Sequence, residues 1–167
     1  MGAGPIGLAT ALFARIEKAN VVVADISSEK LAMCSKLFDL ETLLIDKNTP
    51  AKFAFGFTHV LDATGNVNSM NTGLNYVAHG GTYTLISIVK ENIVFSDPEF
   101  HKRETTLLSS RNALREDFLF VIRCIQDNLI DTNMIKTHST TMENVAEDLP
   151  KWALERDTVI KAIINVN

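Results

Sequence analysis

Three glycines near the start of the sequence have the spacing of a phosphate-binding turn. Gly2, Gly4 and Gly7 form the pattern G-x-G-x-x-G, and apolar residues at helical spacing follow them. Because glycine has no Cβ, backbone N–H groups in such a turn can approach a pyrophosphate, which the positive end of the following helix also favours. Glycine turns also precede helices for purely structural reasons, so this pattern alone does not establish a nucleotide site.

A carboxylate further along the chain strengthens this hypothesis. Asp25 ends the apolar segment VVVAD, roughly 20 residues after the glycine turn, which is the spacing of a dinucleotide-binding unit. A carboxylate there accepts hydrogen bonds from an adenosine ribose and repels a 2′-phosphate, so it favours NAD over NADP. The alternative is that Asp25 caps the next turn. Lys30 either adds positive charge near the adenosine or is a solvated surface residue.

The order of the expected elements indicates an α/β fold. The first part contains a helix from Pro5 to Ile16, followed by strands at 21–25 and 42–45 that a helix capped by Ser28 separates. A further strand ends near Ala63, and an Asn-rich helix follows through Val77 until Gly80 and Gly81 break it. The last strand of this part ends at Ile88. Helices that alternate with short apolar strands are typical of a Rossmann-like, doubly wound parallel sheet. We therefore expect a dinucleotide-binding domain over residues 1–110.

The last third of the sequence has a different pattern. We expect a helical turn with Asp97 as its N-cap, a strand in ETTLLSS, a helix at about 114–127, a strand in MIKTHST, a helix at about 143–153 and a final strand in VIKAIINV. Residues 111–167 are therefore predicted to form a C-terminal α+β extension.

Composition argues against several classes of partner. The 167 residues carry a formal charge of −4 with scattered Lys and Arg, so we expect no nucleic-acid partner. No apolar run reaches the roughly 18 residues that cross a bilayer, and the N-terminus does not resemble a secretory signal, which predicts no membrane contact and a cytoplasmic location. Cys34 and Cys124 each lie on the apolar face of an expected helix and are predicted to be buried thiols. Because the histidines are dispersed and no C-x-x-C or H-E-x-x-H motif occurs, we predict no metal site and name no catalytic residue.

Five segments together carry a family resemblance. GAGPIGLATALFAR, VVVADISSEKLA, HVLDATGN, GLNYVAHGGTYTLISI and ETTLLSSRNALREDF, in this order and spacing, resemble the C-terminal, cofactor-binding half of zinc-type medium-chain alcohol dehydrogenases. The polyol, sugar-acid and threonine dehydrogenases are the most similar group. The resemblance covers almost all of the chain.

The resemblance implies a set of residues that contact NAD. It places Gly2, Gly4, Pro5, Ile6 and Gly7 at the pyrophosphate, Asp25 and Lys30 at the adenosine ribose with Thr64 and Gly65 beside it, Ile86, Ser87, Ile88 and the segment from Ser110 to Asn112 near the nicotinamide, and Lys161 against the pyrophosphate. For Ile86 and Ile88, plain packing in the core is the alternative.

Two departures from the family pattern lead to further expectations. Family members carry, ahead of this region, a catalytic domain whose zinc polarises the alcohol, and residues 1–167 contain no counterpart of it. The sequence also begins inside the glycine turn, so the first strand of the 3-2-1-4-5-6 sheet is expected to be missing. The sheet should then close up, recruit a strand or self-associate. The family also implies a homodimer through the region Asn92–Ser109, and Asp39 stands where a helix-ending glycine is usual.

These observations favour one function and leave others open. The first hypothesis is the NAD-binding portion of a zinc-dependent alcohol, polyol or sugar-acid dehydrogenase, inactive as this chain alone, which in its parent transfers hydride between a secondary alcohol and NAD. The alternatives are a stand-alone nucleotide-binding or dimerisation module and an inert truncated gene product. A flavoprotein is a weaker alternative, because the pairing of DATGN with GGTYTLISI belongs to the dehydrogenase pattern.

Overall fold

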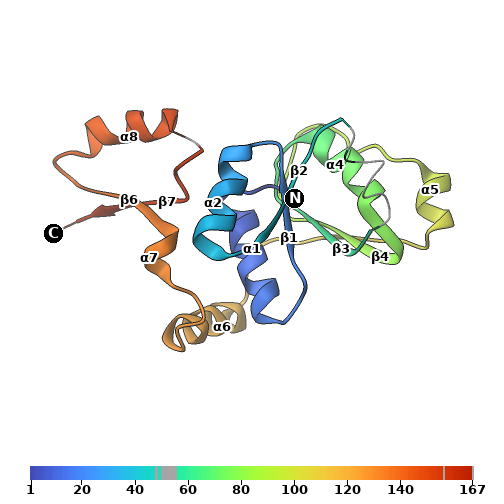
Figure 1. The fold of residues 1–167 in the computed structure, drawn as a ribbon, viewed down its shortest axis with the longest axis horizontal. Helices are drawn as coiled ribbons and strands as arrows, with labels where there is room; N and C mark the ends of the chain where they lie inside the picture. The colour runs from blue at the N-terminus through green and yellow to red at the C-terminus, as the bar shows by residue number, and fades with distance from the viewer. Residues whose placement is uncertain (48, 50–55, 156, 167) are drawn as a thin grey trace.

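The computed structural model describes the whole chain except residues 48, 50–55, 156 and 167. Its elements are α1 (Pro5–Ile16), β1 (Val22–Asp25), α2 (Ser28–Phe38), β2 (Glu41–Leu44), β3 (Phe57–Asp62), α4 (Val67–Gly73), the 3-10 helix η1 (Leu74–Tyr76), β4 (Val77–Leu85), α5 (Asp97–Lys102), β5 (Thr106–Ser109), α6 (Arg115–Gln126), α7 (Thr132–Ile135), β6 (Lys136–Thr141), α8 (Val145–Leu154) and β7 (Lys161–Asn165) (Figure 1). Helices alternate with strands along most of the described chain, as the sequence predicts, except that β3 follows β2 and α7 follows α6.

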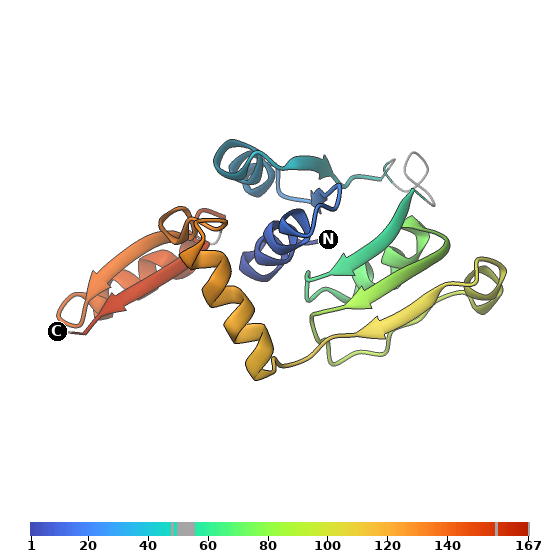
Figure 2. The same ribbon diagram turned by 90° about the horizontal axis from the view of Figure 1, so that it is seen from below.

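Among the described residues, the strands form three parallel sheets. β1 pairs with β2, β4 lies between β3 and β5, and β6 pairs with β7. Within the described residues β1 and β3 do not pair with each other, so the sheet has not closed up. Figure 2 shows the N-terminus between the β1–β2 pair and the β3–β4–β5 sheet, while α6 leads to the β6–β7 sheet. The parallel strands and the helices between them are those of a Rossmann-like α/β fold.

A core between α1, α2 and β1 supports the glycine turn. The buried positions Leu8, Ala11 and Leu12 recur every three to four residues along α1 and pack with Val23 and Cys34. Ile160, far along the chain, completes the same core. The prediction that both cysteines are buried thiols is confirmed, since Cys34 and Cys124 are free and buried.

A second core holds the β3–β4–β5 sheet against α4. Tyr83 is buried there, and its hydroxyl donates to the carbonyl of Met70 at 3.0 Å. Burial and the neighbouring Asp62 raise the pKa of the Tyr83 phenol far above its ordinary value. Arg103 is 1% exposed, and its guanidinium donates to the carbonyls of Leu74 at 2.8 Å and Val77 at 3.2 Å. A charged side chain thus satisfies carbonyls that the end of the 3-10 helix leaves open.

Several element boundaries differ from the predicted ones. Ser27, not Ser28, caps α2, because Ser27 has an extended backbone and its hydroxyl accepts from the amide of Lys30 at 3.3 Å. Likewise, α5 has Ser96 at its N-cap and Asp97 inside the helix. β4 begins at Val77 and runs through Gly80, which does not end a helix. Gly80 has a φ of +68°, and its amide donates to the carbonyl of Arg103 at 2.8 Å.

The end of α2 shows why Asp39 is tolerated there. Asp39 adopts the left-handed conformation with φ 51°, which short polar residues reach more easily than other non-glycine residues. The guanidinium of Arg15 donates to the carbonyl of Phe38 at 2.5 Å, so a residue of α1 satisfies the last turn of α2. In the described part of the chain, no helix is long and apolar enough to cross a membrane. The domain boundary near residue 110 stays a prediction.

Candidate functional site

Two glycines of the turn are required by the protein's own packing. Gly2 has a φ of +90°, and a Cβ on it would lie 3.0 Å from the backbone of Ala63. A Cβ on Gly7 would overlap the carbonyl oxygen of Gly2. Both residues are therefore glycine because α1 and the strand ends approach each other closely at this point.

Gly4 has no such requirement within the protein. It is the N-cap of α1 with a φ of −74°, and a Cβ on it would meet nothing within 4 Å. No side chain caps this helix, and Pro5 at the first helical position has no N–H. Within the part of the chain that the structure describes, no side chain caps the amides of this first turn, and a Cβ on Gly4 would point into open space. An anion approaching from solvent fits this arrangement.

Asp25 connects the glycine turn with the end of β1. One carboxylate oxygen accepts from the amide of Ala3 at 2.6 Å, and the other accepts from the amide of Ser27 at 2.9 Å. The capping alternative considered for Asp25 is thus present in the structure. Each carboxylate oxygen accepts more than one hydrogen bond, so contact with a ribose hydroxyl stays compatible with these bonds.

Lys30 is paired within the chain. Its ammonium lies 3.4 Å from a carboxylate oxygen of Asp157, and the Lys30 side chain is about three-quarters buried. It is therefore not a freely solvated surface residue. A role at the adenosine stays a prediction.

A network around Asp62 shapes the loop after β3, and the sequence analysis did not find it. Asp62 is 0% exposed and accepts from the Thr64 amide at 2.9 Å, the Thr64 hydroxyl at 2.7 Å and the Ser69 hydroxyl at 2.8 Å. The amide of Gly65 donates to the Ser87 hydroxyl at 2.9 Å, which itself lies 3.4 Å from Asp62. The network therefore joins the loops that follow β3 and β4. The spacing D-x-T was a local signal for part of it.

The structure distributes the other predicted site residues unevenly. Thr64, Gly65 and Ser87 lie together through the Asp62 network, next to the glycine turn, because the amide of Ala63 donates to the carbonyl of Met1 at 2.9 Å. Ile86 lines the cavity beside α1. Ile88 is 75% exposed, so the alternative that it packs in the core is wrong.

Two predicted residues lie further along the chain. Asn112 is exposed with a φ of 64°, shortly after Ser110, whose amide donates to the carbonyl of Leu85 at 2.9 Å. This bond places the start of the segment beside the end of β4. Lys161 is exposed at the start of β7, in the β6–β7 sheet. The contacts of the described residues do not link Lys161 to the glycine turn.

Metal ligands are not gathered in this part of the molecule. Among the described residues, no group of three or more His, Cys, Asp or Glu side chains is close enough to hold a metal ion. The geometry points instead to the uncapped start of α1, with a carboxylate at the end of the next strand.

Comparison with known families decides the assignment. The family model of the zinc-binding dehydrogenases matches residues 5–127, which contain α1 with Gly7, Asp25 and the Asp62 network. This chain belongs to the zinc-binding dehydrogenase family. The resemblance seen in the five segments is confirmed.

Curated relatives of this chain are named as dehydrogenases of a sugar acid, a polyol and an amino acid. L-galactonate-5-dehydrogenase of Escherichia coli K12 is 39% identical over 170 residues, which cover 98% of the chain and 50% of that relative. Rat sorbitol dehydrogenase is 34% identical over 101 residues, covering 55% of the chain and 28% of that enzyme. L-threonine 3-dehydrogenase of Saccharopolyspora erythraea is 31% identical over 97 residues, which cover 54% of this chain and 28% of that enzyme. The chain spans about half the length of L-galactonate-5-dehydrogenase.

Solved structures confirm the Rossmann-like fold class. One such structure is an alcohol dehydrogenase of E. coli CFT073, crystallised with NADH. Its match covers 98% of this chain and 50% of that enzyme, with a TM-score of 0.87 at 20% sequence identity. The match to L-idonate 5-dehydrogenase of E. coli covers 98% of this chain and 48% of that enzyme, with a TM-score of 0.82 at 19% sequence identity. The fold of this chain therefore corresponds to about half of each of these enzymes.

Proposed function

We propose that this chain is the NAD-binding portion of a zinc-dependent dehydrogenase that acts on a polyol or sugar acid. The observation that carries the proposal is the open approach to the backbone at Gly4, in front of the uncapped start of α1. The family membership and the 39% identity to L-galactonate-5-dehydrogenase support the class of substrate.

The residues present fit a dinucleotide. The turn from Gly2 to Gly7 would hold the pyrophosphate, and Asp25 the adenosine ribose, with Lys30 near it. The remaining part of the site would be lined by Thr64, Gly65, Ile86 and Ser87. The positions of Asn112 and Lys161 in the structure support a contact with NAD least. When bound, NAD accepts or returns the hydride of the alcohol. We assign activation of the alcohol by zinc to a part of the enzyme outside the described residues, which hold no metal-ligand cluster.

Calorimetric titration with NAD and NADP tests this proposal. We expect NAD to bind at least tenfold more tightly than NADP, because the charge of Asp25 repels a 2′-phosphate. Asp25→Asn keeps an oxygen that accepts from the Ala3 amide but removes the charge. In this variant the ratio of the NADP and NAD dissociation constants should therefore fall about tenfold, which corresponds to roughly 1.4 kcal/mol.

A matched charge change is the control for this titration. Glu41→Gln removes one negative charge at the opposite end of the β1–β2 pair, where Glu41 lies beside Val22. It should leave the preference unchanged. Absence of heat with both nucleotides in the folded wild-type chain contradicts the proposal, whereas equal binding of NAD and NADP contradicts only the role of Asp25.

A homodimer through the region Asn92–Ser109 is part of the same proposal. β5 is an edge strand of its sheet, and all its residues are exposed, including Leu107 and Leu108. An exposed apolar edge strand favours pairing with another strand. We expect sedimentation of the wild-type chain as a dimer and of Leu108→Lys as a monomer with unchanged far-UV circular dichroism. A wild-type monomer at concentrations well above micromolar contradicts this arrangement.

We also propose a cytoplasmic location, where the free thiols of Cys34 and Cys124 stay reduced.

A further inference from the structure

One ion pair joins the start of α2 to the turn that precedes β7. The Lys30 ammonium lies 3.4 Å from a carboxylate oxygen of Asp157, which belongs to the C-terminal part of the chain. About three-quarters of the Lys30 side chain is buried, whereas more than half of the Asp157 side chain is exposed. The ammonium is thus held by a carboxylate that solvent and a ligand can both reach.

Packing of a neighbouring residue brings Asp157 to this position. Ile160 is buried in the same core as Leu31 of α2, although the two residues are far apart in the sequence. The Ile160 amide also donates to the Thr137 hydroxyl at 3.0 Å. Since Asp157 lies close to Ile160 in the sequence, burial of Ile160 places the Asp157 carboxylate beside the first turn of α2.

Hydrogen bonds connect Lys30 to the carboxylate at the end of β1. The Ser27 amide donates to Asp25 at 2.9 Å, and the Lys30 amide donates to the Ser27 hydroxyl at 3.3 Å. The Lys30 backbone therefore has a fixed position relative to Asp25. An ammonium has three N–H donors, so its pairing with Asp157 leaves donors for a neutral ribose hydroxyl.

The charge of Lys30 bears on which nucleotide the site accepts. In dinucleotide-binding folds, a basic side chain near the adenosine ribose accommodates the 2′-phosphate of NADP. Such a phosphate carries about 1.5 to 2 negative charges at pH 7, so it gains most from a cation without a countercharge. Asp157 supplies that countercharge to Lys30. A 2′-phosphate would have to displace the Asp157 carboxylate or lie next to it.

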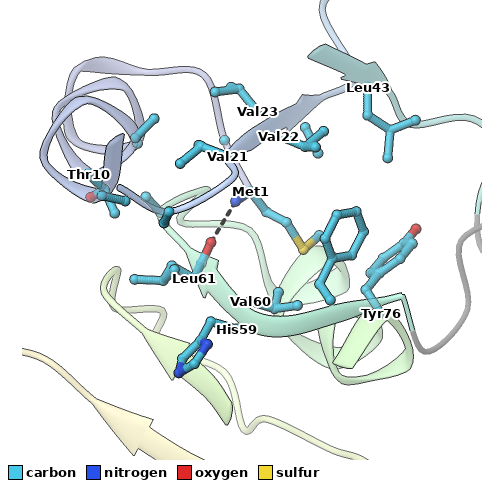
Figure 3. Close-up of a pocket in the computed structure, with 18 of the residues that line it drawn as sticks. Met1, Thr10, Val21, Val22, Val23, Leu43, His59, Val60, Leu61 and Tyr76 are labelled. Atoms are coloured by element: carbon cyan, nitrogen blue, oxygen red, sulfur yellow. Dashed lines mark hydrogen bonds between the residues drawn. The ribbon is translucent and has the colours of Figure 1, made fainter. Parts of the chain in front are cut away.

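The ion pair is separate from the cavity beside α1. That cavity lies between α1, β1 and β3, where Val22, Leu43 and Val60 border it (Figure 3). Lys30 and Asp157 are not among the described residues that line it. A ligand in the cavity would leave the ion pair in place, so an effect of Asp157 on binding reports on the α2 side of the site.

We propose that Asp157 is a specificity-determining residue of the dinucleotide site, which it biases toward NAD by compensating the charge of Lys30. This inference rests on the proposed NAD-binding function and adds a residue of the C-terminal part to it. Asp25 repels a 2′-phosphate by its own charge, whereas Asp157 acts through Lys30. The effect of Asp157 should therefore disappear when Lys30 loses its charge.

Calorimetric titration of Asp157→Asn with NADP and with NAD tests the inference. Asparagine has the shape of aspartate without its charge, and the exposed position tolerates it. We expect the affinity for NADP to rise about three- to fivefold and the affinity for NAD to change less than about twofold, the scale of a half-exposed charge pair. The gain should shrink in about 1 M salt, where mobile ions screen the charges.

Three further variants locate the effect at Lys30. Lys30→Met keeps an apolar stem without the charge, so its combination with Asp157→Asn should remove the gain in NADP affinity. Asp157→Glu retains a carboxylate and should keep the wild-type ratio of the NADP and NAD dissociation constants. Glu155→Gln removes the same charge nearby, where the carboxylate lies 3.7 Å from His138, and should leave this ratio unchanged.

The outcomes separate this inference from the proposed function. If NAD binds and Asp157→Asn leaves the ratio unchanged, the inference is wrong while the proposed function stands. Equal losses of both affinities with a lower Tm also contradict the inference, because the ion pair then only holds the turn before β7 against α2. A gain of equal size in Glu155→Gln or in the Lys30→Met background contradicts it as well, since the effect is then one of general charge. If neither nucleotide binds the folded wild-type chain, the proposed function fails and the inference fails with it.

Discussion

Replacing Asp62 by alanine is expected to lower the free energy of unfolding by about 3 kcal/mol, because hydrogen bonds to a buried charged group are each worth roughly 1.5–3 kcal/mol. Asp62 is fully buried and accepts from the Thr64 amide, the Thr64 hydroxyl and the Ser69 hydroxyl. Alanine leaves these donors without their acceptor at the end of β3. Urea denaturation followed by circular dichroism measures the loss.

The same substitution should also weaken NAD binding. Asp62 fixes Thr64 directly, and Ser87 connects the network to the amide of Gly65. Without the carboxylate this loop loses its defined position beside the glycine turn. We expect the affinity for NAD to fall at least tenfold at a temperature where the variant is still folded.

Two further variants separate the network from a general effect of charge. Asp62→Asn keeps one carbonyl acceptor and should lose less stability than Asp62→Ala. Asp97→Ala removes an exposed carboxylate at the start of α5 and should cost less than about 1 kcal/mol, the scale of a helix-terminal charge. Equal losses for Asp62→Ala and Asp97→Ala contradict the role assigned to the network.

The sequence was sufficient where local pattern and packing agree. The apolar spacing after Pro5 predicts α1, and the continuous apolar segment before Asp25 predicts β1, because buried helices and parallel strands need just these patterns. The choice between Ser27 and Ser28 as the cap of α2 was not accessible in this way. Either serine supplies the oxygen, and only the backbone conformation determines which one accepts from Lys30.

Features that depend on distant residues were harder to predict. Gly80 was expected to break a helix, but it lies within β4, where its amide bonds to the carbonyl of Arg103. The Asp62 network needs Ser87 from the next strand along the sheet, so only its Thr64 part had a local signal. The sequence left open whether the sheet closes up, recruits a strand or self-associates. Among the described residues β1 and β3 do not pair with each other, and this depends on contacts between segments far apart in the sequence.

Gly4→Ala is expected to reduce NAD affinity at least tenfold, about 1.4 kcal/mol, while the chain stays folded. A Cβ on Gly4 meets nothing within 4 Å, so the methyl group fits the protein without displacement. Alanine is a poorer N-cap than glycine, but this difference costs only about 1 kcal/mol or less of stability. The methyl group instead occupies the space through which a pyrophosphate approaches the first turn of α1. Calorimetric titration gives the affinity, and thermal unfolding gives the stability.

Gly7→Ala is the matched comparison, because it adds the same methyl group in the same turn. There the Cβ overlaps the carbonyl oxygen of Gly2, so the cost should appear in stability, with a loss of at least about 2 kcal/mol from the forced backbone shift. The two variants therefore separate glycine that packing requires from glycine that a ligand requires. If Gly4→Ala binds NAD as tightly as the wild-type chain does, the open space at the start of α1 is not where the pyrophosphate lies.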